Sequence, residues 1–192
     1  FKYRVIEGAP AVGVNPDELI LDGQQRLTSI YSSLFSDAAV NTRTDKGQAI
    51  KRFYYIDIKK AIDPEVDRVD AIVSVPENRQ LTSNFGRNIE LDISKSEMEY
   101  EQLLFPLNCI LEPTKYGKWQ MDCMQYHNYA AEINKIYMEF LTKVIVPIGQ
   151  YTIPVITLDK DTPKEAVCQV FENVNTGGVS LTVFELITAV FA

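Results

Sequence analysis

The sequence predicts a mixed α+β fold, and three observations lead to this prediction. An apolar run at residues 19–21 predicts a short strand, and residues 24–35 follow it with apolar positions at helical spacing. Residues 52–58 and 69–75 are rich in aromatic and β-branched side chains, which favour strands. Residues 121–148 carry a helical apolar pattern over a longer range. Short strands and helices therefore flank a long helical middle.

The connecting segments have weaker patterns. Residues 1–18 contain Gly and Pro at short intervals, which predicts irregular structure. Residues 36–51 predict a polar loop. Residues 76–96 are rich in polar residues without a sustained period. An apolar stretch at residues 105–111 is followed by a turn predicted at residues 113–117.

The last part of the chain predicts a strand and two helices. Residues 151–158 (YTIPVITL) predict a strand, and Pro154 favours an edge or a bulge. Thr162 is a good N-cap, because Pro163 suits the first helical position and Glu165 completes a capping box. A final helix is expected from about Leu181.

Together these elements predict one domain over residues 1–192. We expect a strand-helix-strand core at residues 1–75, a largely helical insertion at residues 76–150, and a strand with two helices at residues 151–192. Because no Met begins the chain, we expect an N-terminally truncated domain that starts inside a longer protein.

Composition narrows the class of protein. The net charge is −7, so contact with nucleic acid requires a local basic patch rather than whole-surface attraction. No apolar run reaches the roughly 18–20 residues that span a bilayer, so no membrane partner is expected. The cysteines are far apart and form no CxxC pair, which disfavours disulfides and thiolate zinc sites and predicts a reducing, cytoplasmic location: Cys109, Cys123 and Cys168.

The most informative motif is the DGQQR segment, residues 22–26, at the predicted strand-to-helix junction. Gln24, Gln25 and Arg26 belong to the first turn of the helix, where unpaired backbone N–H groups favour an anion. Asp22 adds an acceptor or a metal ligand, and Gly23 permits the turn. The segment thus suits phosphoryl transfer to water, with Asp22 holding a divalent metal or orienting water.

In this chemistry, Arg26 and an amide such as that of Gln25 stabilise charge on the phosphoryl oxygens. A purely structural interpretation stays open, in which Asp22 is an N-cap, Gly23 a turn residue, and Arg26 half of a stabilising ion pair.

A second polar cluster follows the helix predicted from Thr162. Asn173, Asn175, Gly177 and Gly178 can present amide and backbone donors in a tight loop. A helix C-cap explains the same residues, because Asn and Gly are common where helices end. His127 is the single histidine, and no nucleophile or orienting acid lies near it in sequence, which disfavours a histidine-dependent hydrolase or an HNH nuclease within these residues.

The two motifs together, with the Phe-Pro-Leu at residues 105–107, resemble the GmrSD-type restriction endonuclease N-terminal domain family. The resemblance covers nearly the whole chain. It implies a ParB/sulfiredoxin-like core with a helical C-terminal portion. It also implies a prokaryotic modification-dependent (type IV) restriction or phage-defence system, in which this domain binds and hydrolyses a nucleoside triphosphate with Mg²⁺ or a similar cation.

The resemblance further implies roles for individual residues. Asp22, Gln25 and Arg26 become catalytic candidates, and Asp22 is also the metal ligand. The nucleotide-binding candidates are Gly23, Gln24, Asn175 and Gly178. Partners implied are modified or foreign DNA, contacted by the full-length protein, and an HNH nuclease domain, fused or separate, whose active site lies outside this segment.

The residues leave two alternatives to this assignment. One is a non-enzymatic, ParB-like DNA-binding or protein-interaction module, in which the DGQQR segment is a cap or a DNA-backbone contact. The other is phosphodiester cleavage by this domain itself. An upstream Gln-Arg segment usual in the family does not appear in these residues, so part of the nucleotide site is expected outside them.

Overall fold

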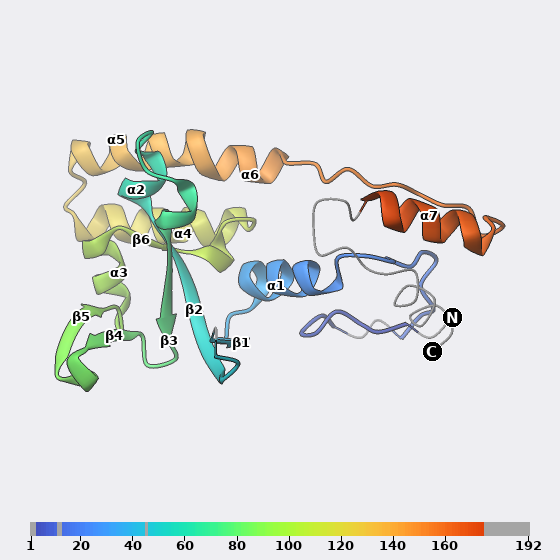
Figure 1. Ribbon diagram of the computed structural model, residues 1–192. Coiled ribbons are helices and arrows are strands. Elements are labelled where there is room, and N and C mark those ends of the chain that lie inside the picture. Colours follow the sequence, from blue (N-terminus) through green and yellow to red (C-terminus); the bar gives the residue numbers. More distant parts are fainter. Residues whose placement is uncertain (1–2, 11–12, 45, 175–192) are drawn as a thin grey trace. The chain divides into compact units, whose positions relative to one another are not determined.

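A computed structural model describes residues 3–10, 13–44 and 46–174 (Figure 1). The chain forms two compact units, Phe1–Tyr151 and Thr152–Ala192. The first unit combines helices with small antiparallel sheets, which confirms the predicted α+β class.

The main sheet is built around one long strand, β2 (Ala49–Asp57), which Figure 1 shows at its centre. β1 (Val40–Arg43) pairs with its first half, β6 (Leu104–Pro106) pairs with its last residues, and β3 (Ile72–Pro76) pairs along most of its length. All these pairings are antiparallel. A separate hairpin joins β4 (Gln80–Ser83) and β5 (Asn88–Asp92).

Helices of the first unit precede, interrupt and follow the strands. Short helical turns occur at Arg68–Ala71 (η1), Asn84–Gly86 (η2), Leu107–Cys109 (η3) and, with π geometry, Leu141–Ile145 (η4). The α-helices are α1 (Gln24–Phe35), α2 (Ile58–Ile62), α3 (Ser96–Gln102), α4 (Pro113–Tyr126), α5 (Ala131–Phe140) and α6 (Val146–Gln150).

The core lies where α4 and α5 pack against the end of the sheet. Phe105 is fully buried and makes edge-to-face contacts with Trp119 at 5.2 Å and with Phe140 at 5.3 Å between ring centroids. Such pairs add to the stabilisation from burying their large apolar areas. A second, smaller cluster forms on the other side of β2, around Tyr55 and Val75.

Two predicted strands are wrong. Residues 19–21 and 151–158 have no regular structure, and their apolar side chains are exposed apart from that of Leu158, which is half-buried. A strand needs a neighbour that takes its backbone hydrogen bonds, and among the described residues neither segment has one. An apolar run alone therefore did not suffice to predict a strand.

Other predictions gave the wrong type of element or the wrong boundaries. The predicted loop at residues 36–51 contains β1 and the start of β2, because a turn at Gly47, with φ +78°, brings the two together. Residues 76–96 contain the β4–β5 hairpin, and residues 113–117 are the first turn of α4 rather than a loop. The first half of the strand predicted at residues 69–75 is the turn η1.

The long helix predicted over residues 121–148 is divided. Asn128 and Tyr129 adopt positive φ between α4 and α5, a conformation that ends a helix. The spacing predicts one apolar face made of Ala130, Ile133, Tyr137, Phe140, Leu141 and Val144. From α5 onward this is confirmed, since Tyr137, Phe140 and Val144 are buried and Ile133 and Leu141 are half-buried, whereas Ala130 is exposed. In the second unit, α7 (Lys164–Val174) begins one residue later than the capping pattern predicts, because the Pro163 carbonyl accepts the first helical hydrogen bond, from the N–H of Val167. The helix expected from Leu181 lies outside the described residues.

Candidate functional site

The DGQQR segment lies at the start of α1, as its pattern predicts. Gly23 is the N-cap residue with φ +84°, a left-handed conformation that glycine adopts readily and other residues adopt at a cost. The Gly23 carbonyl accepts the first helical hydrogen bond, from the N–H of Leu27 at 2.8 Å. Gly23 thus turns the chain so that the side chains of Asp22 and Arg26 meet.

Asp22 and Arg26 form an ion pair at the surface. The Arg26 Nη2 donates a hydrogen bond to the Asp22 Oδ2 at 2.8 Å, and the two side chains are 73% and 39% exposed, respectively. The interpretation of Asp22 as a side-chain N-cap is wrong, because its carboxylate makes no capping hydrogen bond. Both charged groups therefore face solvent and can be reached by a ligand.

The first turn of α1 is open to an anion. Among the described residues no side chain caps its backbone N–H groups, and no acidic residue lies within the turn. Unpaired N–H groups and the helix dipole together favour a negatively charged group at this position. Gln24 and Gln25 are exposed on the same turn and add amide donors. The structure thus brings Asp22, Gln25 and Arg26 to one end of one helix.

The remaining predicted residues of the site cannot be placed beside this helix end. Asn175 and Gly178 lie outside the described residues. Their assignment to the nucleotide site stays a prediction.

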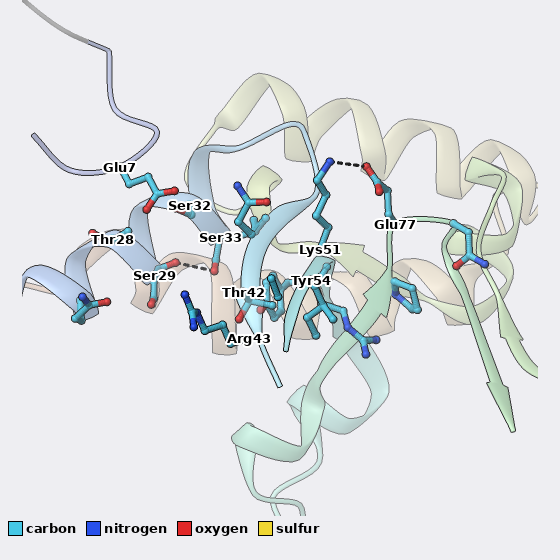
Figure 2. Close-up of a pocket in the computed structure, with 18 of the residues that line it drawn as sticks. Glu7, Thr28, Ser29, Ser32, Ser33, Thr42, Arg43, Lys51, Tyr54 and Glu77 are labelled. Carbon is cyan, nitrogen blue, oxygen red and sulfur yellow. Dashed lines mark hydrogen bonds and ion pairs between the residues drawn. The ribbon is translucent and has the colours of Figure 1, made fainter. Parts of the chain in front are cut away.

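A hollow that the sequence did not predict lies along the next turns of α1. We call it the α1 groove; it is open to solvent, has a volume of about 1360 Å³, and Figure 2 shows it between α1 and the β1–β2 hairpin. Gln25 is the only member of the DGQQR segment on its wall. Hydroxyls line the helix side: Thr28, Ser29, Ser32 and Ser33. Their spacing is that of one helical face, which is the sequence signal that identifies them.

The sheet side of the α1 groove carries basic residues. Arg43, Lys51 and Arg52 line it, and Lys51 is paired with Glu77 at 3.2 Å. Among the described residues, the guanidinium groups of Arg43 and Arg52 have neither an ion-pair partner nor a hydrogen-bond partner. Within the part of the chain that the structure describes, these two arginines are thus unpaired cations, in a protein of net charge −7.

A second arginine–carboxylate pair is buried inside the first unit. Glu99 Oε1 accepts hydrogen bonds from the Tyr55 hydroxyl at 3.0 Å and from the Arg79 Nη1 at 3.1 Å. Burial raises the pKa of the Glu99 carboxyl, and the bond from Tyr55 and the charge of Arg79 oppose that rise. Arg79 also stacks over the Phe53 ring, 4.4 Å from its centroid. Tyr55, Arg79 and Glu99 do not line the α1 groove, so this pair is separate from the surface described above.

His127 and two of the cysteines, Cys109 and Cys123, take part in packing. His127 Nε2 lies 2.9 Å from the Tyr100 carbonyl oxygen. Burial raises the pKa of the Cys109 and Cys123 thiols to about 11, so both are protonated at neutral pH and are poor metal ligands. Within the described ranges no three His, Cys, Asp or Glu side chains gather as a metal site, and no helix there is long and apolar enough to cross a membrane.

Comparison with known proteins identifies the family. Residues 6–192 match the model of the GmrSD restriction endonuclease N-terminal domain, and the chain therefore belongs to that family. It is also 27% identical over 195 residues to an uncharacterized protein from Methanocaldococcus jannaschii. That alignment covers 97% of this chain but 30% of the relative, so the chain spans about a third of its length. No solved structure matches the chain, and the ParB/sulfiredoxin-like core stays a prediction.

Proposed function

We propose that this chain is a nucleotide-binding and NTP-hydrolysing regulatory domain of a prokaryotic modification-dependent (type IV) restriction or phage-defence system. The observation that carries the proposal is the exposed Asp22–Arg26 pair beside an uncapped helix N-terminus. Membership of a restriction endonuclease family supports the biological setting.

The proposed reaction transfers a phosphoryl group to water. The water oxygen forms a bond to the γ-phosphorus while the bond from that phosphorus to the β–γ bridging oxygen breaks, which yields a nucleoside diphosphate and phosphate. Of the two protons of the water, one stays on the phosphate product and the other is released to solvent. Arg26 donates hydrogen bonds to the phosphoryl oxygens as their charge develops, and Gln25 adds an amide donor. Asp22 either orients the attacking water by accepting one of its hydrogen bonds or holds a divalent cation.

Within the described residues, the site offers a divalent cation a single carboxylate, that of Asp22. Mg²⁺ in nucleotide sites is commonly held by one or two carboxylates together with phosphate oxygens. Asp22 offers one exposed carboxylate, and the described residues supply no second acidic residue in the first turn of α1. Asp22 is therefore the ligand we propose for Mg²⁺, which would supply charge neutralisation on the phosphates when bound.

The partners proposed for the whole protein follow from the family. They are a nucleoside triphosphate, modified or foreign DNA, and an HNH nuclease domain, fused or separate, in a cytoplasmic location. The nuclease chemistry is assigned to that domain and not to these residues.

Turnover of NTP by the full-length protein tests the proposal. Arg26→Ala and Asp22→Ala should each lower the turnover number by about 100-fold or more, the loss expected when an electrostatic group that acts in the transition state is removed. Lys118→Ala is a matched control, because Lys118 forms a comparably exposed i,i+4 pair with Asp122 in α4. It should leave turnover unchanged.

Two results would contradict the proposal. One is unchanged turnover in both Asp22→Ala and Arg26→Ala. The other is an equal fall in turnover in the Lys118→Ala control. Strong DNA binding without nucleotide, weakened by both substitutions in the DGQQR segment and by salt, would favour the non-enzymatic module instead.

A further inference from the structure

The α1 groove carries features that NTP hydrolysis at the DGQQR segment does not use. Its walls hold the two unpaired guanidiniums of Arg43 and Arg52 and four hydroxyls of α1. Asp22 and Arg26 are not among its lining residues. The groove is thus a separate surface that begins beside the proposed nucleotide site at Gln25.

The register of the sheet explains why these side chains are available. Successive strand residues point to opposite faces, so Phe53 and Tyr55 face the second core cluster while Arg52 and Tyr54 face the other way. Ile56 is on the same face as Arg52 and Tyr54, and it is buried in the larger core cluster, the one that contains Phe105. At Arg52 and Tyr54 the face instead borders the α1 groove.

The neighbouring strand continues the same surface. Val40 lies opposite Arg52 in the β1–β2 ladder, and Thr42 lies opposite Ile50. Residues directly opposite in a ladder share a face, so Thr42 adds a hydroxyl to the face that carries Ile50 and Arg52. Arg43 ends the edge strand β1 opposite Ala49, so the strand alternation directs it to the other face of the sheet from Arg52; its exposed side chain nevertheless lines the same hollow (Figure 2).

The chemistry of these walls fits phosphate groups. Guanidiniums bind phosphate oxygens through paired hydrogen bonds, and Ser and Thr hydroxyls are common donors to nucleic-acid backbones. The Ser33 hydroxyl already donates to the Ser29 carbonyl oxygen at 2.7 Å, so the α1 donors to a phosphate are Thr28, Ser29 and Ser32. Tyr54, half-buried on the wall, provides an aromatic surface of the kind on which bases stack. Of the two carboxylates on the lining, Glu77 is held by Lys51, and Glu7 comes from the irregular segment before α1.

The size of the hollow favours a polymer over a free nucleotide. Pockets for small molecules usually measure about 300–1,000 Å³ and enclose most of the ligand. The α1 groove is larger, at about 1360 Å³, and is open to solvent. We propose that the α1 groove binds the phosphate backbone of a nucleic acid through Arg43, Arg52 and the hydroxyls of α1. This inference goes beyond the proposed nucleotide site and does not require NTP hydrolysis.

Anisotropy of a fluorescent DNA oligonucleotide, as a single strand and as a duplex, tests the proposal with the full-length protein. The double variant Arg43→Ala/Arg52→Ala should lower affinity for the better-bound form by about ten-fold at moderate salt. The slope of log affinity against log salt should fall by about 1 for each phosphate group that the variant no longer neutralises. Glu7→Gln should do the opposite and tighten binding, because it removes repulsion between Glu7 and the phosphates.

Two further variants show whether the effect is specific to the α1 groove. Arg87→Ala removes an exposed arginine next to β5, outside the groove, and should change neither affinity nor slope. Arg43→Ala alone, at an exposed edge position, provides the test if the double variant does not fold. The groove variants should retain NTP turnover, because they leave the DGQQR segment intact. The nucleotide assignment is tested separately, by the turnover of Asp22→Ala and Arg26→Ala.

Three results would overturn the inference. The first is that the unmodified protein binds neither form of DNA. The second is that the groove variants and Arg87→Ala lose affinity equally. The third is that the groove variants weaken binding of free NTP but leave the affinity for the oligonucleotide unchanged. That result would mean that Arg43 and Arg52 bind the nucleotide and not a nucleic acid.

Discussion

Two arginine–carboxylate pairs of nearly equal length serve this protein in different ways. The Asp22–Arg26 pair spans 2.8 Å with side chains 39% and 73% exposed, whereas the Glu99–Arg79 pair spans 3.1 Å with side chains 6% and 32% exposed. Water and salt screen the first pair, so it contributes little to folding. The second pair has lost most of its water, so each partner depends on the other.

The surroundings of the two pairs reinforce this difference. Glu99 is held by Tyr55 as well as by Arg79, and Arg79 lies over an aromatic ring. Asp22 and Arg26 have only each other among the described residues. Of the two, the exposed pair is therefore the one that can exchange its partner for a ligand without disturbing the fold.

The largest expected effect is on the buried pair. Arg79→Ala leaves the Glu99 carboxylate without its counter-charge and should lower the free energy of unfolding by about 2–3 kcal/mol. Chemical denaturation measures the change. Arg87→Ala, on the exposed surface, is the matched control and should stay within about 0.5 kcal/mol of the unmodified protein. Equal losses in the two variants would contradict a structural role for the buried pair.

The buried pair also predicts a pH dependence of stability. Burial raises the folded-state pKa of Glu99 above its ordinary value of 4.5, so the folded protein binds this proton more tightly than the unfolded chain does. The resulting stabilisation is fully present below pH 4.5 and is lost as pH rises through the folded-state pKa. Within that window, Glu99 contributes a slope of at most about −1.4 kcal/mol per pH unit.

Urea denaturation at several pH values, on the unmodified protein and on Glu99→Gln, isolates this contribution. The difference in unfolding free energy between the two proteins should change across the window and be constant above it. A difference that stays the same from pH 4 to pH 7 would show that Glu99 does not titrate abnormally.

A smaller effect is expected at the turn before α1. Gly23→Ala places a Cβ on a residue with φ +84° and should lower the free energy of unfolding by about 1 kcal/mol. The nearest side-chain atoms to that Cβ are those of Arg26, at 3.8 Å, so crowding adds little to the backbone strain. Thermal denaturation measures the loss; Gly117→Ala, in the middle of α4 and with open space around it, should instead be neutral or stabilising.

The smallest effect is expected on the exposed pair. Arg26→Ala and Asp22→Ala should each change the free energy of unfolding by no more than about 0.5 kcal/mol, the usual contribution of an exposed i,i+4 pair. Denaturation curves of the two variants, compared with that of Arg79→Ala, test the contrast directly. A loss as large as that of Arg79→Ala would mean that the DGQQR segment supports the fold rather than a ligand.

Predictions that rest on local patterns were largely confirmed. The helix after Gly23 begins and ends close to the predicted residues, and the buried face of α5 is the one that its spacing predicts. The start of α7 follows from Pro163 and its neighbours. Each of these features depends on residues within one or two helical turns of one another, which is the range that a sequence pattern describes.

Predictions that depend on a distant partner were less successful. The apolar residues 19–21 and 151–158 resemble strands, yet among the described residues they lack neighbouring strands. Conversely, β4 and β5 are polar and form a hairpin because they pair with each other. The hydroxyls of α1 are visible as a helical stripe, but nothing in the sequence shows that Arg52 faces them.

The sequence by itself determined that a helix follows Gly23, that Asp22 and Arg26 stand one turn apart at its start, and which family the chain resembles. These are consequences of backbone preferences and of residues close together in the chain. Only the tertiary structure decided that one arginine–carboxylate pair is buried and the other exposed, and that Arg43 and Arg52 border a groove beside α1. Burial and the meeting of distant side chains depend on which surfaces exclude water when the whole unit packs, and spacing along the chain does not encode this.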